Sequence, residues 1–213
     1  MPAARSTIIV GLTGGVGSGK TTAERLCKAW GYPTADADLW AHELLAHDAA
    51  VQAKVRAYCR KCYTMDPLLP SGELDRAALA QRAFADGRLL ALLERLIHPR
   101  VRRRAAAWIA AQRAQRAPLA LLVVPLLLES GMNADVDVVL SIAAPEALRC
   151  ARLRKTRGWS EAHVRARMAR QLDEDERCRR SDAVVTNTGG KQAFAAALRQ
   201  TLTRIRLRHD RKH

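Results

Sequence analysis

Aromatic residues are scarce in this chain of 213 residues, because four Trp, three Tyr and two Phe make up only 4% of it. Proteins that bind single-stranded nucleic acid depend on aromatic side chains on which the bases stack, so the scarcity argues against that class. Acidic residues are also few, since 21 Asp and Glu stand against 36 Lys and Arg and leave a formal net charge of +15. Such a charge attracts anions of any kind and does not distinguish nucleic acid, membrane and phosphorylated metabolites.

Long apolar runs and paired cysteines are missing as well. The longest apolar run, residues 118–128, is about half the length that a membrane-spanning helix needs. The five cysteines are an odd number, and Cys59 and Cys62 form a C-x-x-C motif without the second pair that a structural zinc site requires. Residues 1–7 are too few for a signal peptide. We therefore expect a soluble cytoplasmic protein with reduced thiols and no membrane partner.

The apolar residues that are present, 48% of the chain, are enough for a buried core. Residues 7–13 are apolar and β-branched without alternation, which predicts a strand covered on both faces, as in a parallel sheet. A helix over residues 20–30 and a short strand over 32–35 follow, so the first segment of the chain has the form of a βαβ unit. The predicted fold class is α/β.

The middle of the chain has a different pattern. Residues 39–117 carry apolar side chains at three- and four-residue steps, which predicts a helical insertion. Strands and helices then return to complete the first region. The predicted elements are strands at 119–125, 136–142 and 183–186, a helix from 145, a basic loop at 154–160, one long helix from 160 to about 180, and a final helix to about 207.

The glycine-rich segment between the first strand and the first helix matches G-x-x-x-x-G-K-[ST] at every fixed position. Glycines let backbone N–H groups face phosphate oxygens, and the following helix adds its N-terminal dipole. Lys20 can neutralise charge on the β- and γ-phosphates, and the Thr21 hydroxyl can ligate Mg²⁺. We predict a site for a nucleoside triphosphate. Its residues are Gly14, Gly15, Val16, Gly17, Ser18, Gly19, Lys20 and Thr21.

Two carboxylates, Asp36 and Asp38, follow the second predicted strand. They fall at the carboxyl edge of the sheet, where open α/β sheets bind their ligands. Carboxylates there can hold Mg²⁺ through water and accept the proton of an attacking hydroxyl. The alternative is that both residues merely cap the start of a helix.

These motifs together resemble the dephospho-coenzyme A kinases, a family of P-loop kinases, over nearly the whole chain. The order and spacing of the matches make the resemblance specific, whereas the phosphate loop alone would not. The matching residues are the LTGGVGSGKTT of 12–22, the DAD of 36–38, 72–76, 96–99, 124–129, Pro145, Glu146, Arg152, Gln171, Asp182, Asn187 and Gly189.

The resemblance implies MgATP-dependent phosphorylation of the 3′-hydroxyl of the ribose of dephospho-coenzyme A, giving coenzyme A and ADP. It implies a P-loop kinase core, a parallel sheet flanked by helices, with an inserted helical substrate domain and a helical lid. It places the core in residues 1–41, 118–150 and 181–213, the substrate domain in 42–117 and the lid in 151–180. We expect a monomer or weak homo-oligomer without a specific nucleic-acid partner.

The resemblance also implies roles for single residues. Asp38 would be the general base, with Lys20 and Arg152 completing the catalytic set. Asp36 would support the base or, through water, the metal, and would belong to the substrate site together with Arg76 and His98. His98 has an alternative reading as an ordinary histidine near a helix end. The ATP site would consist of residues 14–21 together with Thr22 and with Asn187 near the adenine.

The lid departs from the family pattern, which has an Arg, three residues, and then Arg-Asp-Gly. Here Thr156 takes the place of the second arginine, and Arg157 replaces the aspartate. Arg152 therefore remains the first lid arginine, and either Arg154 or Arg157 would serve as the second.

Two rival functions are consistent with parts of the sequence. Another small P-loop kinase, acting on a nucleoside or nucleotide, would share the phosphate loop. A non-catalytic nucleic-acid-binding protein would use the positive charge but would leave that loop unexplained. A kinase that also binds polyanions weakly through its surface charge is a third reading, since the proposed site uses only about five of the cations.

Overall fold

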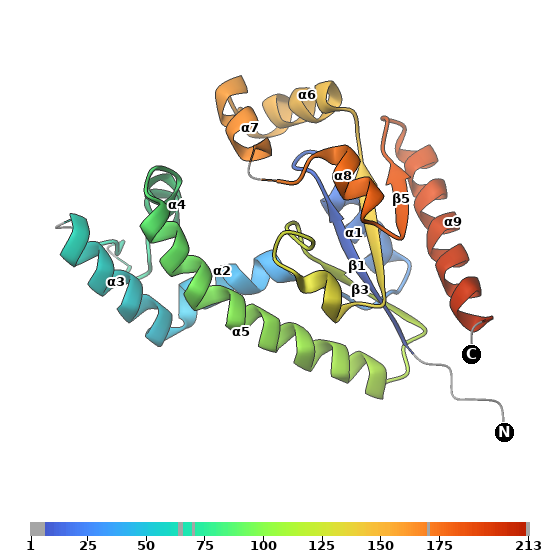
Figure 1. Ribbon diagram of the computed structural model, residues 1–213, viewed down its shortest axis with the longest axis horizontal. Coiled ribbons are helices and arrows are strands. Elements are labelled where there is room, and N and C mark those ends of the chain that lie inside the picture. The colour runs from blue at the N-terminus through green and yellow to red at the C-terminus, as the bar shows by residue number, and fades with distance from the viewer. Residues whose placement is uncertain (1–6, 64–65, 70, 170, 212–213) are drawn as a thin grey trace. The chain divides into compact units, whose positions relative to one another are not determined.

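The computed structural model describes residues 7–63, 66–69, 71–169 and 171–211 (Figure 1). The chain divides into two compact units. The first consists of Met1–Asp36 together with Trp108–His213, and the second of Ala37–Ala107. The first unit holds the sheet, whereas the described residues of the second form helices and an isolated antiparallel bridge between Leu68 and Leu74.

The sheet of the first unit has five strands in the order β2-β3-β1-β4-β5, and every pair of neighbours is parallel. In its centre, Val10 is in register with Leu121 on one side and with Val138 on the other. This arrangement confirms the predicted α/β class with a parallel sheet. The strands are β1 (Ile8–Gly14), β2 (Thr34–Asp36), β3 (Leu119–Val123), β4 (Val138–Ala143) and β5 (Ala183–Thr186).

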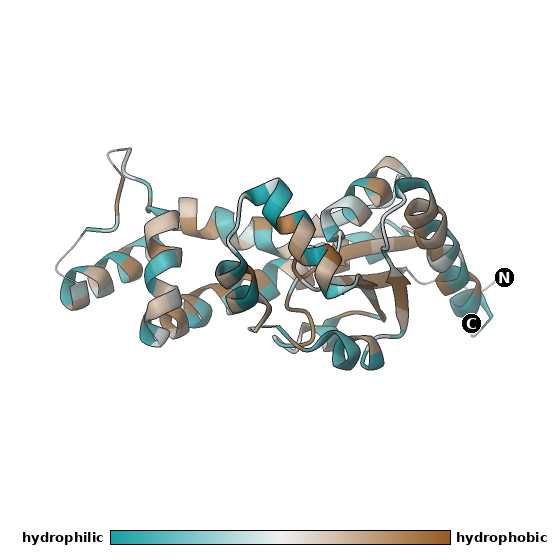
Figure 2. Ribbon diagram, turned by 90° about the horizontal axis from the view of Figure 1, so that it is seen from above, coloured by the Kyte–Doolittle hydropathy of each residue, from teal (hydrophilic) through white to brown (hydrophobic). Residues whose placement is uncertain are grey.

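The central strands are buried on both faces, as the unbroken apolar runs predict. Every residue of β1 and β3 is buried. Helices α1 (Lys20–Ala29) and α9 (Lys191–Asp210) contribute Cys27, Phe194 and Leu198 to the core that covers one face. In Figure 2 the strands are brown along their length, while α9 carries both brown and teal, as a helix with one buried face should.

The region between β4 and β5 differs from the prediction in two places. Residues 154–157, predicted as loop, are the end of α6 (Glu146–Arg157), which stops at Gly158 with a φ of 63°. The single helix predicted over 160–180 is two helices, α7 (Glu161–Met168) and α8 (Glu174–Arg179). The break has a local cause, because the side chain of Asp173 accepts hydrogen bonds from the backbone of α8 and caps a new helix there.

The second unit contains α2 (Ala37–His47), α3 (Ala49–Tyr63), α4 (Arg76–Ala85) and the first three-quarters of α5 (Gly87–Ala114). These helices agree with the helical insertion that the apolar spacing predicts. Val51, Val55 and Cys59 form the buried stripe of α3 at four-residue steps. The division of the chain into a substrate domain and a lid is a functional statement and stays a prediction.

Two cysteines are buried, one in each unit. Cys27 of α1 and Cys59 of α3 are fully buried, whereas Cys62 is exposed. Burial raises the pKa of the Cys27 thiol to about 12 and also raises the pKa of Cys59. Among the described residues, no helix is both long and apolar enough to cross a membrane.

Candidate functional site

The phosphate loop joins β1 to α1 at the carboxyl edge of the sheet. Gly17 and Gly19 have φ angles of 79° and 109°, a backbone conformation that other residues rarely adopt. Gly19 is the N-cap of α1 and provides no capping side chain. A helix N-terminus of this kind combines donor N–H groups with the positive end of the helix dipole, and it therefore favours a bound phosphate.

Lys20, the first residue of α1, reaches back over the start of the loop. Its Nζ donates hydrogen bonds to the carbonyl oxygens of Gly14 at 2.6 Å and Gly15 at 3.0 Å. The ammonium group is thus held beside the loop backbone, where it can meet a phosphate bound by the loop N–H groups.

Asn187 and Arg152 are brought to the same loop from distant parts of the chain. Asn187, which follows β5, is buried, and its Nδ2 donates to the Ser18 carbonyl at 2.8 Å. Arg152 of α6 donates to the Asn187 Oδ1 at 3.1 Å and to the Ser18 carbonyl at 3.4 Å. A Cβ on Gly19 would lie only 2.2 Å from the Asn187 Nδ2, so a glycine is needed for this packing.

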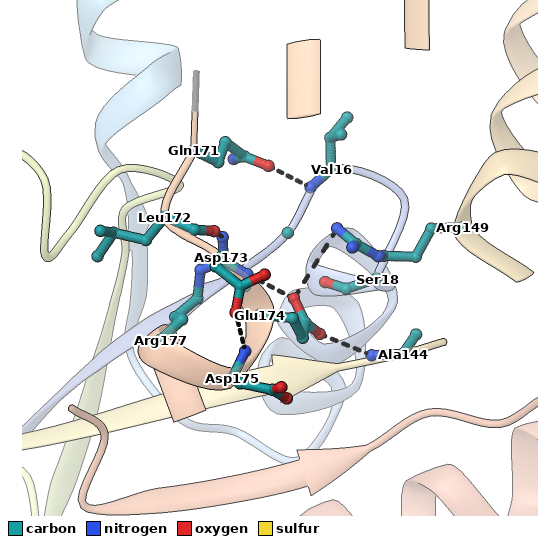
Figure 3. Close-up of polar contacts among 12 residues, drawn as sticks. Val16, Ser18, Ala144, Arg149, Gln171, Leu172, Asp173, Glu174, Asp175 and Arg177 are labelled. Carbon is teal, nitrogen blue, oxygen red and sulfur yellow. Dashed lines mark hydrogen bonds and ion pairs between the residues drawn. The ribbon is translucent and has the colours of Figure 1, made fainter. Parts of the chain in front are cut away.

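A buried ion cluster also lies against the loop (Figure 3). Glu174 makes ion pairs with Arg177 at 2.5 Å and with Arg149 at 3.8 Å, and its other oxygen accepts the Ala144 N–H at 3.0 Å. The two arginine side chains are 1% and 8% exposed. A Cβ on Gly15 would lie 2.2 Å from Arg149 Nη1, so the guanidinium packs directly against the loop backbone.

Sequence reasoning gave Arg149, Glu174 and Arg177 no role. One signal could have pointed to Arg149, because it is four residues before the buried Leu153 and so shares the inward face of α6. An arginine on the apolar face of a helix calls for a buried partner. The acidic partner is Glu174 at the start of α8, and it could not be identified from the sequence because the break between α7 and α8 was not predicted.

The remaining predicted residues lie elsewhere in the chain. Asp36 is the last residue of β2 in the first unit and is half-buried. Asp38 is exposed in the first turn of α2, which belongs to the second unit. Arg76, the first residue of α4, and His98, which precedes Pro99 within α5, are exposed residues of the second unit. The structure thus brings Lys20, Arg152 and Asn187 together in the first unit, whereas the roles of the others stay predictions.

A glycine-rich loop that leads from the central strand of a parallel sheet into a helix beginning Lys-Thr defines a nucleotide-binding protein of the P-loop class. The family profile of dephospho-CoA kinase matches residues 8–193. The chain belongs to the dephospho-CoA kinase family and is therefore an ATP-dependent kinase.

Curated relatives and solved structures agree with this family. A dephospho-CoA kinase of Anaeromyxobacter dehalogenans is 36% identical over 198 residues, which cover 93% of this chain and 92% of the relative. One of Methylococcus capsulatus is 37% identical over 195 residues, covering 90% and 94%. The crystal structure of TT1252 from Thermus thermophilus is 34% identical, with a TM-score of 0.74 and coverage of 93% and 98%. A dephospho-CoA kinase from Campylobacter jejuni, 19% identical with a TM-score of 0.66 and coverage of 93% and 97%, shares the fold.

Proposed function

We propose that this kinase transfers the γ-phosphate of MgATP to the 3′-hydroxyl of the ribose of dephospho-coenzyme A, giving coenzyme A and ADP. The observation that carries the proposal is the phosphate loop in its strand-to-helix setting, with Lys20, Arg152 and Asn187 around it. The family match over residues 8–193 supports the choice of acceptor.

The loop and Lys20 would hold the phosphates of ATP. Phosphoryl transfer requires positioning and charge neutralisation more than covalent chemistry by the protein. Backbone N–H groups of Gly17, Gly19, Lys20 and Thr21 would surround the β-phosphate, and the Lys20 ammonium would move from the Gly14 and Gly15 carbonyls towards the β- and γ-oxygens. Asn187 is assigned to the adenine end of the nucleotide through the family resemblance.

The oxygen donors of this site suit Mg²⁺. Thr21 places an exposed hydroxyl in the first turn of α1, and Asp36 places a half-buried carboxylate at the end of β2. Among the described residues, no group of three or more His, Cys, Asp or Glu side chains is placed so that it could hold a metal ion. Thr21 and, through water, Asp36 would hold a bound Mg²⁺ beside the phosphates of ATP, which suits an ion that usually keeps several waters. The ion would neutralise charge on the β- and γ-phosphates.

Asp38 would serve as the general base. As the 3′-oxygen bonds to the γ-phosphorus, the hydroxyl proton passes to the Asp38 carboxylate. The bond from the γ-phosphorus to the β,γ-bridging oxygen breaks, and ADP leaves with the electron pair. Asp36, two residues earlier in the chain, would orient Asp38 or the waters on the metal.

The other two functional regions are assigned by position. Residues 42–117 would bind dephospho-coenzyme A, with Arg76 and His98 as contacts. Residues 151–180 would form the lid, with Arg152 as its first arginine. Arg154 and Arg157 stay alternatives for the second. Both are exposed, and the Arg157 guanidinium carbon lies 5.0 Å from the centre of the Trp159 ring.

The test is an acceptor panel with the purified chain. MgATP is offered with dephospho-coenzyme A, adenosine or AMP in separate reactions, and ADP release and coenzyme A formation are measured by chromatography and mass spectrometry. We expect coenzyme A to form and dephospho-coenzyme A to be the best acceptor by kcat/KM. Faster turnover of AMP or adenosine would replace the proposal with a nucleotide or nucleoside kinase.

A further inference from the structure

The connection between α7 and α8 touches the loops that follow three neighbouring strands. We call residues 171–174, the end of this connection and the first residue of α8, the clasp. Strands β3, β1 and β4 are adjacent in the centre of the sheet, so the loops at their carboxyl ends are neighbours. The clasp is bonded to each of them. The contacts are Val16 N–H to Gln171 Oε1 at 2.7 Å, Leu172 N–H to Glu129 Oε1 at 2.9 Å, and Ala144 N–H to Glu174 Oε1 at 3.0 Å.

The contact with the phosphate loop is made by a neutral side chain. Figure 3 shows the Gln171 side chain pointing towards the Val16 N–H, which it accepts through its amide oxygen. A carboxylate at this position would also accept the bond, but it would place a negative charge beside a loop that has to bind phosphates. A side-chain amide fixes the backbone donor without that repulsion.

The buried ion cluster stabilises the clasp, because Glu174 belongs to both. Arg177 is 1% exposed, pairs with Glu174 at 2.5 Å and also donates to the carbonyl of Leu172. Asp173 caps α8 through the N–H groups of its first turn, and those bonds lower the pKa of its carboxyl. Gln171 therefore belongs to a segment whose conformation is fixed by these contacts.

The loop that Gln171 contacts consists largely of glycine. Four of the six residues from 14 to 19 are glycines, and glycine loses more backbone freedom on ordering than any other residue. A bond that fixes the middle of such a loop before ATP arrives reduces the entropy that ATP binding must overcome. Val16 lies at that middle position.

We propose that Gln171 is a positioning residue for the nucleotide, which fixes the phosphate loop through the Val16 N–H. Gln171 acts through the loop backbone and does not touch the reacting atoms. The inference rests on the proposed function, because it assumes that the loop binds the phosphates of ATP. Its effect should fall on nucleotide affinity and leave the acceptor site unaffected.

The experiment compares Gln171→Leu and Gln171→Glu with a matched control, Gln192→Leu, at an exposed position near the start of α9. Three quantities are measured for each protein: the Kd for MgADP by calorimetry, the KM values for ATP and acceptor, and the exchange rate of the Val16 amide by NMR. Gln171→Leu has a similar size but no acceptor. Gln171→Glu retains an acceptor and adds a charge.

For Gln171→Leu we expect MgADP to bind about tenfold more weakly, the KM for ATP to rise similarly, and the Val16 amide to exchange faster, with the acceptor KM unchanged. Gln171→Glu should keep the slow exchange of Val16 and still weaken MgADP binding through charge repulsion. The control should match the wild type in all three quantities.

The inference would be overturned if Gln171→Leu bound MgADP with the wild-type affinity and its Val16 amide exchanged at the wild-type rate. An equal rise of both KM values together with a lower Tm would also overturn it, because that result indicates a general structural role. If the wild-type chain fails to phosphorylate dephospho-coenzyme A, the proposed acceptor is wrong. The MgADP and exchange measurements require no turnover and still decide the role of Gln171.

Discussion

The two units of this kinase present their functional residues in opposite ways. In the first unit, the phosphate loop is built from backbone and is held by buried contacts from Asn187 and Arg149. In the second, Arg76 and His98 are exposed side chains on helices, and their roles come from the family resemblance. A site made of backbone is defined by packing that can be described without a ligand, whereas a site made of exposed side chains is defined by the ligand that it contacts.

This contrast predicts different failures on mutation. Changes around the loop should alter nucleotide binding and folding, whereas changes in the helical unit should alter the acceptor or the chemical step and leave the nucleotide bound.

The largest effect is expected from Asp38→Asn, in the first turn of α2. Loss of a general base lowers kcat by about 10²–10⁴-fold, and MgADP should bind as in the wild type because the loop is unaffected. Single-turnover kinetics and calorimetry measure the two quantities. Asp210→Asn, exposed near the end of α9, is the control. Undiminished turnover of the Asp38→Asn protein would exclude Asp38 as the base.

Lys20→Ala should lower kcat by about 10²–10³-fold, since it removes a charge that stabilises the phosphates in the transition state. Nucleotide affinity should fall as well, in contrast to Asp38→Asn. Steady-state kinetics at saturating dephospho-coenzyme A measures both effects. The matched control is Lys28→Ala, further along α1, where the ammonium pairs with Glu24 on the surface. Comparable losses in the two lysine variants would argue against a specific role of Lys20.

Arg76→Ala should raise the KM for dephospho-coenzyme A by about tenfold or more, as expected for the loss of a charge-assisted hydrogen bond. The KM for ATP should stay constant. Initial rates over a matrix of both substrate concentrations separate the two values, and Arg95→Ala, an exposed arginine of α5, is the control. A rise in the KM for ATP alone would show that Arg76 does not belong to the acceptor site.

Gly15→Ala probes the packing of the loop directly. The new methyl group would meet Arg149 Nη1 at 2.2 Å, so the guanidinium has to shift away from Glu174. Overpacking of this kind lowers the free energy of unfolding by about 1–3 kcal/mol, which thermal or urea unfolding measures. A Cβ on Gly87 would meet nothing within 4 Å, and Gly87→Ala should leave stability equal or slightly higher. An unchanged stability of Gly15→Ala would show that the Arg149 contact is easily displaced.

The sequence allowed the sheet and the phosphate loop to be predicted because both depend on local signals. An apolar strand, a fixed glycine spacing and the following Lys-Thr identify the loop without tertiary information. The boundary between α7 and α8 was missed because the charges of that segment suit a helix, and the capping role of Asp173 competes with continuation of the same helix.

Arg149 was overlooked for a different reason. Arg149 is one of 36 cations, and its place on the apolar face of α6 is a weak signal that does not identify its partners, Gly15 and Glu174. The same holds for Gln171, which matched the family pattern but whose partner, Val16, is 155 positions away along the chain. Contacts between residues so far apart in the sequence depend on the topology of the fold and not on a local sequence pattern.

The two buried cysteines make the units separately observable by chemical labelling. The thiols of Cys27 and Cys59 are fully buried, and burial raises the pKa of both, so a maleimide reagent can modify each one only when its own unit opens. Exposed Cys62 should react first and serve as the internal reference. We expect ATP to slow the labelling of Cys27 and dephospho-coenzyme A to slow that of Cys59. Mass spectrometry of the labelled peptides would then report occupancy of each unit in the native enzyme, without a mutation.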